Sequence, residues 1–318
     1  MAEFSLIDKF CKGIGAVHPE TKLSVGDDAA VVEVPKGMEL AISVDTMVAG
    51  VHFYPDVSPE KIAHKLLAVN LSDMAAMGAQ PKWATMTLTT PTVDQDWLSK
   101  FASTLSTTAK AYGVQLIGGD TTQGELNLSI QIMGLLPKGK ALSRSGSKPE
   151  DDLYLSNNIG DAALALKLIN DKKVVNESLV KALELPEPQV ALGLELLSIA
   201  NSCIDVSDGV VADCSHIARQ SQVSIEIDIE KLPLSDDYLN YIAEGGDRDL
   251  ALTGGDDYQL AFTAPQTQRN SIDALSQQLG HKLTRVGRVK EQGAELVCLF
   301  NHGQPYQFKS NAGYQHFQ

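Results

Sequence analysis

The chain has 318 residues, a length that favours two domains because a single hydrophobic core stops growing at roughly 250–300 residues. Its formal net charge of −14 disfavours nucleic acids and anionic membranes as partners. No apolar run approaches the roughly 18 residues of a membrane-spanning helix, and we expect no signal peptide. The four cysteines show neither a Cys-x-x-Cys nor a metal-site spacing, so we expect reduced thiols in a cytoplasmic protein.

In the first half of the chain, apolar residues either alternate or recur at helical spacing. The alternating or continuous apolar runs predict strands at 23–34, 39–44, 83–90, 114–117 and 126–136. The helical spacing predicts helices at 59–77 and 97–112. Residues 138–149 are rich in Gly, Ser, Lys and Pro and lack periodicity. We therefore expect a linker there, between an N-terminal domain at 1–137 and a C-terminal domain at 150–318.

The second half repeats the mixture of strands and helices. Strands are predicted at 153–156, 203–206, 225–229, 258–263 and 283–289. Helices are predicted at 161–169, 190–200 and 271–279, and a fourth follows residues 207–209 and runs through residue 219. Both halves contain Gly-Gly-Asp, at 118–120 and at 254–256, and this echo hints at a duplicated architecture.

A set of aspartates stands at predicted strand ends or helix starts, most of them beside Gly, Ser or Thr: Asp27, Asp28, Asp45, Asp73, Asp120, Asp205, Asp208, Asp256 and Asp257. If several converge, each pair about 4 Å apart costs roughly 4 kcal/mol at an effective dielectric of 20. Such a cluster needs cations, and oxygen ligands without His or Cys favour Mg²⁺, Mn²⁺ or Ca²⁺ over Zn²⁺. Taken singly, each aspartate is better explained as a turn or helix-cap residue, whereas the set as a whole favours metal binding.

Motifs for phosphate binding are incomplete in this chain. Residues 134–140 approximate a P-loop, but Ala141 replaces the Ser or Thr that would hold Mg²⁺, and Pro137 removes an amide donor. No Gly-x-Gly-x-x-Gly opens a helix, so a Rossmann dinucleotide site is not supported. Arg144 lies in a polar loop and is either a fork for a phosphate or a solvated side chain. His52, taken alone, is more typical of a structural histidine.

Several short motifs occur in a fixed order over nearly the whole chain: Gly26-Asp27-Asp28-Ala29, Ser43-Val44-Asp45-Thr46, Gly50-Val51-His52-Phe53, Asn70-Leu71-Ser72-Asp73, Gly118-Gly119-Asp120-Thr121, Arg144-Ser145-Gly146, Ile204-Asp205-Val206-Ser207-Asp208-Gly209, Gly254-Gly255-Asp256-Asp257-Tyr258 and Gly313-Tyr314-Gln315-His316-Phe317. On these motifs the chain resembles the thiamine-monophosphate kinases. These bacterial cytosolic enzymes phosphorylate thiamine monophosphate to thiamine diphosphate with ATP, the last step in thiamine diphosphate biosynthesis.

The resemblance implies an α/β (α+β) architecture, the two-domain fold of the aminoimidazole ribonucleotide synthetase superfamily. An N-terminal domain that binds ATP and Mg²⁺ would form a β-barrel across a homodimer, and an α/β domain would follow it. The implied ligands of several Mg²⁺ ions are Asp28, Ser43, Val44, Asp45, Asp73, Asp120, Asp205 and Asp208, with Ser43 and Val44 acting through the backbone. The implied ATP contacts are Gly119, Asp120, Arg144 and Ser207. The implied contacts to thiamine monophosphate are His52, Asp256 and Tyr314.

Three positions depart from the family pattern. Gln189 stands where the family often has Arg, so we carry no phosphate role to it. Asp256 stands where Glu is common, and Ala312 stands where a Trp often precedes the terminal Gly-Tyr. Within the opening motif we interpret Asp28 as a metal ligand and Asp27 as a brace of the turn.

The implied reaction is a direct in-line transfer of the γ-phosphoryl group, with Mg²⁺ and positioning doing most of the work. One alternative is another ATP-using member of the superfamily: a purine synthetase, a selenophosphate synthetase or a hydrogenase maturation factor. The other is a Ca²⁺-binding module without enzymatic activity, although no EF-hand spacing is present.

Overall fold

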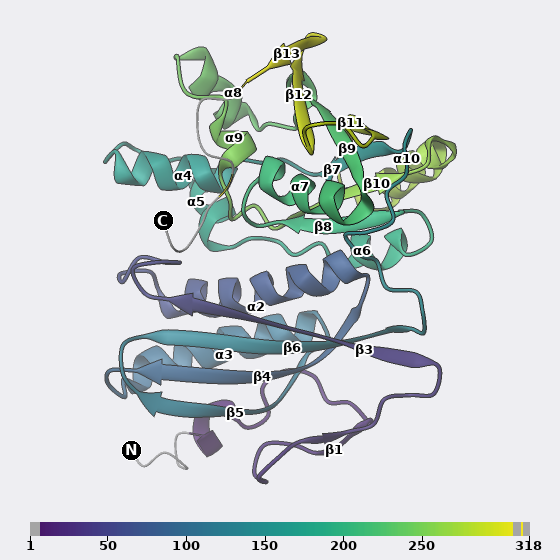
Figure 1. Ribbon diagram of the computed structural model, residues 1–318. Helices are drawn as coiled ribbons and strands as arrows, with labels where there is room; N and C mark the ends of the chain where they lie inside the picture. Colours follow the sequence, from purple (N-terminus) through teal and green to yellow (C-terminus); the bar gives the residue numbers. More distant parts are fainter. Residues whose placement is uncertain (1–6, 308–312, 314–318) are drawn as a thin grey trace. The chain divides into compact units, whose positions relative to one another are not determined.

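The computed structural model describes residues 7–307 and residue 313 (Figure 1). The chain divides into two units, each with its own sheet. The first comprises Met1–Met74 with Ala79–Ala141, and the second comprises Ala75–Gly78 with Leu142–Gln318. None of the helices in the described part of the chain combines the length and apolar character needed to traverse a bilayer.

The first unit is built on a four-stranded sheet of order β3-β6-β4-β5. Its strands are β3 (Met38–Val48), β6 (Asn127–Pro137), β4 (Gln80–Thr90) and β5 (Gln115–Gln123). Neighbours pair antiparallel except β4 and β5, which are parallel and are joined through helix α3 (Gln95–Ala111). Strands β1 (Thr21–Leu23) and β2 (Val31–Val32) form a separate small antiparallel pair. A short π-helix, η1 (Ile7–Cys11), precedes them.

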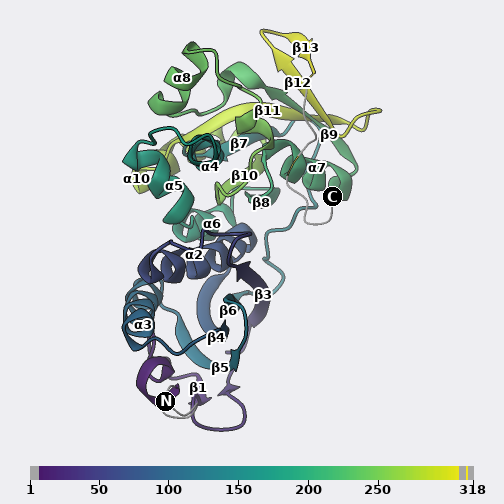
Figure 2. The same cartoon turned by 90° about the vertical axis from the view of Figure 1, so that its left-hand side faces the viewer.

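Alternation along the strands gives this sheet two different faces. On β6, the buried residues Leu128, Ile130 and Ile132 face α3 and α2 (Pro59–Met77), which cover one side of the sheet (Figure 2). On the opposite side, β3 presents Ile42 and Val44, whose exposed fractions are 57% and 58%. The helices therefore cover one face of the four-stranded sheet. The second face is packed only in part, by a cluster around Trp83 and Met133 that Val32 of β2 contacts, and it stays apolar and open at Ile42 and Val44.

The second unit contains a seven-stranded mixed sheet of order β13-β12-β9-β11-β7-β10-β8. The strands are β7 (Asp152–Ser156), β8 (Ser202–Val206), β9 (Val223–Asp228), β10 (Gln259–Ala264), β11 (Leu283–Glu291), β12 (Val297–Asn301) and β13 (Gln304–Tyr306). The helices are α4 (Asp161–Asn170), α5 (Glu177–Glu184), α6 (Val190–Leu196), α7 (Val210–Ser221), α8 (Asp236–Ala243), α9 (Leu250–Thr253) and α10 (Arg269–Leu279). Two 3₁₀ turns, η2 (Ile229–Lys231) and η3 (Gln266–Gln268), complete the unit.

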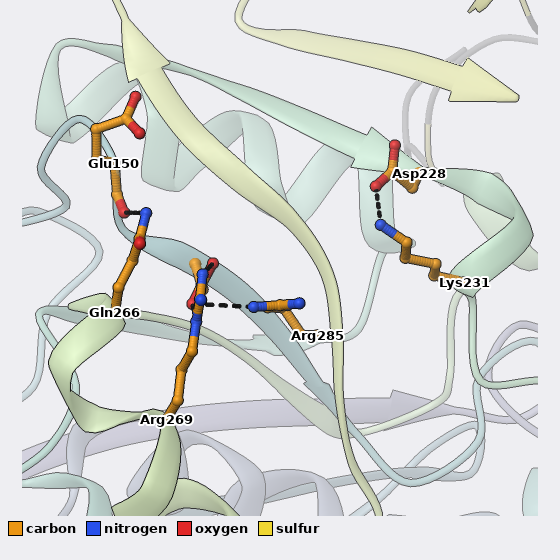
Figure 3. A network of polar contacts seen from close by, with 7 residues as sticks. Glu150, Asp228, Lys231, Gln266, Arg269 and Arg285 are labelled. Carbon is orange, nitrogen blue, oxygen red and sulfur yellow. Dashed lines mark hydrogen bonds and ion pairs between the residues drawn. The ribbon is translucent and has the colours of Figure 1, made fainter. Parts of the chain in front are cut away.

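Both faces of this larger sheet are covered. Leu153 and Leu155 of β7 join a hydrophobic core that includes residues of α4, α5 and α7. Asp152, one position before Leu153, points to the opposite face, where its carboxylate accepts two hydrogen bonds from Arg269 at 2.5 and 2.8 Å. Arg285 lies 3.7 Å from the same carboxylate (Figure 3). These ion pairs fasten the start of α10 and strand β11 to β7.

The helix predicted at 59–77 has those bounds in the structure, and most predicted strands are present within a few residues of their expected ends. Three differences matter for the site. The strand predicted at 23–34 is wrong, because β1 and β2 are separated by a loop that contains residues 26–30. Strand β3 continues to Val48 and β5 to Gln123, so Asp45 and Asp120 lie within strands and not at their ends. Main-chain hydrogen bonds to the neighbouring strand continue past both aspartates. The pattern of apolar residues does not reveal this continuation, because it reports side chains and not main-chain pairing.

Besides the two 3₁₀ turns, three α-helices and two strands of the second unit were not predicted: α5, α8, α9, β12 and β13. All are short, and short segments carry weak periodicity. The Gly-Gly-Asp motif that both halves share also occupies different structural positions in the two units. The first Gly-Gly-Asp lies inside β5, whereas the second lies in the loop before β10.

Candidate functional site

In the first unit, strand β3 and helix α2 bring together a group of predicted metal ligands. Ser43 and Asp45 lie two residues apart on β3, on the face that α2 covers. The hydroxyl of Ser43 donates a hydrogen bond to the Asp73 carboxylate at 2.5 Å. The amide of Asp45 donates to Oδ1 of Asn70 at 3.2 Å, and Asn70 in turn donates to the Leu66 carbonyl at 2.8 Å. Asn70 was not predicted as a site residue, although it belongs to the same motif as Asp73.

The environment of Asp45 is electrostatically unfavourable for a carboxylate. Burial, followed by the negative charge of Asp73, raises the pKa of Asp45 to about 6 from its ordinary value of 3.8. Two carboxylates held this way gain from a cation placed beside them. The pair therefore has the chemistry of a hard-metal site. Within residues 7–307 and 313, however, no three or more His, Cys, Asp or Glu side chains are already arranged around one metal position.

Asp27 and Asp28 occupy the loop between β1 and β2, and both are exposed. Neither side chain hydrogen-bonds to another residue in the described part of the chain. Within the turn, the backbone of Asp27 forms a bridge to Val25, and its role as a brace of the turn stays a prediction. Asp28 is available as an open carboxylate on a loop.

Asp120 lies in β5, at the opposite edge of the four-stranded sheet from Asp45. It is in register with Thr87 of β4 and is exposed. Gly119, immediately before it, has φ +156°, and a Cβ at this position would lie 1.9 Å from the Met86 carbonyl oxygen. Only glycine permits β4 to approach this closely. The Gly-Asp pair therefore sits on a strand whose local path depends on glycine.

His52 lies in the turn that follows β3. Its Nδ1 accepts a hydrogen bond from the Val48 amide at 3.0 Å, and its own amide donates to the Val48 carbonyl at 3.0 Å. These bonds fix the ring relative to the end of β3. In the neutral ring, accepting at Nδ1 places the proton on Nε2, which makes Nε2 the donor toward any ligand.

In the second unit, the turn between β8 and α7 carries three predicted residues. Asp205 is buried within β8, and Ser207 and Asp208 follow the strand, both half-buried. The amides of residues 207, 208 and 209 all donate to Oδ2 of Asp213 at 3.1 Å. Asp213 was missed from the sequence. Its signal in the sequence is an acidic residue in the first turn of α7, which by itself does not distinguish it from other helix-start acids.

A second loop packs against this turn. The amide of Asp256 donates to the Ser207 carbonyl at 2.9 Å, and the hydroxyl of Tyr258 donates to Oδ1 of Asp256 at 2.9 Å. Asp256 and Tyr258 both have positive φ, +70° and +49°. Between them, Asp257 is buried and accepts from the Gly160 amide, and burial raises its pKa well above the ordinary value. The structure therefore separates the roles of the adjacent acids, with Asp257 holding the start of α4.

The loop that carries Arg144 is also fixed by α7. Ser221, the last residue of α7, donates to the Arg144 carbonyl at 3.1 Å and accepts from the Ser147 amide at 3.2 Å. The Arg144 side chain is exposed. Burial lowers the pKa of His216, and the positive charges of Arg144 and Arg219 lower it further. This end of α7 therefore presents a local concentration of positive charge in an otherwise acidic protein.

The remaining predictions concern the tail and the departures. Tyr314 and Ala312 lie outside the described residues. Gly313 is described: a Cβ there would lie 2.6 Å from Ala212 Cβ, so this part of the tail approaches the start of α7. Gln189 is buried and donates to the Glu187 carbonyl at 2.7 Å.

The chain is similar to known proteins in its family model, its sequence and its structure. The model of "AIR synthase related protein, N-terminal domain" matches residues 26–136. Thiamine-monophosphate kinase of Escherichia coli (strain K12) is 40% identical over 320 residues, which span 99% of this chain and 98% of that protein. The crystal structure of thiamine-monophosphate kinase from Stenotrophomonas maltophilia K279a matches with 38% identity and a TM-score of 0.86, over 96% of this chain and 98% of that one.

A further structure carries ligands. AaThiL complexed with AMPPCP and TMP matches with 31% identity and a TM-score of 0.78, over 99% of this chain and 97% of that one. These matches confirm the predicted α/β class and the aminoimidazole ribonucleotide synthetase-like fold.

Proposed function

Because this chain belongs to the thiamine-monophosphate kinase family, we infer that it uses ATP to phosphorylate thiamine monophosphate. The observation that carries this inference is similarity over essentially the whole chain, 40% identity across 99% of its length. A related structure that holds AMPPCP and TMP supports both substrates. The products are thiamine diphosphate and ADP.

This phosphoryl transfer requires the protein to position the two substrates more than to transfer a proton. An oxygen of the acceptor phosphate attacks the γ-phosphorus in line, one P–O bond forms, and the bond to ADP breaks. The acceptor is already an anion, so no strong base is needed. Two highly charged anions must instead be held together in a protein whose net charge is −14. Cations have to offset that repulsion.

We assign Mg²⁺ as the cation because the donor set is built from oxygen. The residues that would hold it are Asp28, Ser43, Val44, Asp45, Asp73 and Asp120 in the first unit, and Asp205 and Asp208 in the second. The raised pKa of Asp45 beside Asp73 fits a position where a cation relieves repulsion. When bound, Mg²⁺ would neutralise the phosphate charge and orient the transferring group.

The contacts to the two substrates follow from the chemistry of the side chains. Arg144, on a loop anchored by Ser221, can fork two phosphate oxygens of ATP. We assign Gly119, Asp120 and Ser207 to the same nucleotide. We assign three residues to thiamine monophosphate: His52, which would donate from Nε2–H, Asp256 and Tyr314.

A homodimer is proposed from the open face of the four-stranded sheet. Ile42 and Val44 are more than half exposed on β3, beside Thr46 and Gln131 on the same face. Burying exposed apolar side chains against a second copy favours association by about 25 cal/mol for each Å² of apolar surface that is removed from water. The two edge strands, β3 and β5, also leave main-chain groups for pairing with a partner.

The strand order gives the dimer a role in the site. Asp45 on β3 and Asp120 on β5 are separated by three strand spacings, about 14 Å for spacings of about 4.8 Å. Ligands of one Mg²⁺ place their oxygens about 2 Å from the ion, and an aspartate side chain is too short to close the remaining gap. We therefore propose that Asp45 of one protomer works with Asp120 of the partner subunit.

We propose a cytoplasmic location from the state of the cysteines. All four are free, and Cys203 and Cys214 are buried where no partner thiol pairs with them. This pattern suits a reducing compartment.

The test of function is the conversion of thiamine monophosphate with ATP and Mg²⁺, followed by chromatography of thiamine and adenine nucleotides. We expect thiamine diphosphate and ADP in equal amounts, and Asp45→Asn should abolish turnover. Asp171→Asn, an exposed carboxylate paired with Lys167 on the surface, is the matched control and should retain it. Absence of thiamine diphosphate, or AMP as the main product, would overturn the proposal.

A further inference from the structure

The turn between β8 and α7 is organised around one buried carboxylate. Oδ2 of Asp213 accepts hydrogen bonds from three successive amides, those of Ser207, Asp208 and Gly209, each at 3.1 Å. Asp213 is 2% exposed. Successive amides that converge in this way form a concave anion site, of the kind that other proteins fill with a phosphate. Here the chain fills it with its own side chain.

The turn is held from its other side as well. The Ser207 carbonyl accepts the amide of Asp256 at 2.9 Å, so the peptide groups on both sides of the turn are engaged. Gly209 has φ +117°, and a Cβ there would lie 2.8 Å from the Thr253 carbonyl carbon. The backbone of residues 207–209 therefore has one available path, and that path fixes where the Ser207 and Asp208 side chains begin.

Asp213 is a buried carboxylate, and its removal from water is costly unless hydrogen bonds replace the lost hydration. The three amides of the turn supply those hydrogen bonds. A purely structural link between β8 and α7 does not need an acid, since a Ser or Asn side chain caps helix starts well. A carboxylate suits three amides aimed at one oxygen better, because a charged acceptor forms hydrogen bonds about twice as strong as those of a neutral one.

From this geometry we infer that Asp213 is a positioning residue, which sets the turn so that Asp208 reaches the divalent cation and Ser207 reaches the nucleotide. Asp213 touches neither ligand itself and acts through the backbone of residues 207–209. This role rests on the proposed function, in which Ser207 and Asp208 serve ATP and Mg²⁺. Supporting residues of this type typically change metal affinity by about 10–100-fold when they are altered.

The test compares Asp213→Asn with Asp161→Asn. Asp161 is also a partly buried carboxylate in the first turn of a helix, but it accepts from Ser235 and lies outside the turn. Mn²⁺ binding is measured by electron paramagnetic resonance in the presence of AMPPCP, alongside thermal unfolding. We expect Asp213→Asn to weaken Mn²⁺ binding at least about tenfold and to raise the apparent KM for Mg²⁺. Asp161→Asn should leave both at wild-type values, whatever its effect on the melting temperature.

Equal Mn²⁺ affinity in Asp213→Asn and wild type would overturn the positioning role, even if the variant were less stable. If Asp213→Asn does not fold, Asp213→Glu keeps the charge and moves the oxygen by one methylene, and we expect it to show the same loss of Mn²⁺ affinity. Wild-type Mn²⁺ affinity in folded Asp213→Glu would likewise contradict the inference. Failure of wild-type protein to make thiamine diphosphate would contradict the proposed function and is recorded separately from Mn²⁺ binding.

Discussion

A site shared between protomers predicts that two inactive variants restore each other when they form mixed dimers. Asp45 and Asp120 lie on the two edge strands of one sheet, about 14 Å apart across three strand spacings. In a mixed dimer of Asp45→Asn and Asp120→Asn protomers, one site carries both substitutions. The other combines the unaltered Asp45 of one protomer with Asp120 of the partner subunit and is intact.

The size of the recovery follows from random assortment under two-fold symmetry. An equal mixture contains about half mixed dimers, each with one intact site of two, so about one quarter of wild-type activity is expected. The two variants are co-expressed with different affinity tags, and dimers that carry both tags are purified and should reach about half of wild-type activity. Thiamine diphosphate formation and Mn²⁺ bound per dimer are both measured.

The control is a mixture of Asp45→Asn with Asp73→Asn. These two carboxylates act in one protomer, because Asp73 raises the pKa of Asp45 and holds Ser43 beside it. Every site in that mixed dimer carries one substitution, so activity should stay at the level of the separate variants. Recovery in the control, or none with Asp45→Asn and Asp120→Asn, would refute the shared site.

Three further predictions test the dimer face, the charge balance and the fold. Ile42→Glu should convert dimers to monomers in sedimentation velocity, whereas Val174→Glu, at a residue that is 94% exposed in the second unit, should leave dimers intact; a dimeric Ile42→Glu protein would argue against this face. The raised pKa of Asp45, about 6, means that the folded state binds more protons than the unfolded state, so stability falls as pH rises from about 4 to about 6. In EDTA, Asp45→Asn should therefore be about 1–3 kcal/mol more stable than wild type at pH 7.5 and equal to it near pH 4 by urea unfolding, and a variant less stable at pH 7.5 would contradict this sign. Arg269→Met strips the buried carboxylate of Asp152 of its bidentate partner and should lower the free energy of unfolding in urea without changing kcat; unchanged stability would show that the pair contributes little.

Much of the site was visible in the sequence because short motifs are local. The sequence Asn70-Leu71-Ser72-Asp73 falls on a helix whose bounds follow from apolar spacing alone, and the structure places Asp73 beside Ser43 and Asp45. The acids after β8 were likewise identified from an apolar run that ends in Asp and Ser. In each case the chemistry depends on neighbours within a few residues, and the sequence records those neighbours directly.

What the sequence determined by itself was the set of elements, their apolar faces and the motifs that identify the family. The tertiary structure decided which acids meet, since strand order depends on pairing between residues far apart in the chain. Asp45 and Asp120 share a pattern in the sequence, yet they occupy opposite edges of one sheet. Asp213 is an unremarked helix residue until three amides from the preceding turn converge on its carboxylate. These contacts span only four to six residues, but apolar periodicity does not report the conformation of the turn that brings the amides onto the carboxylate.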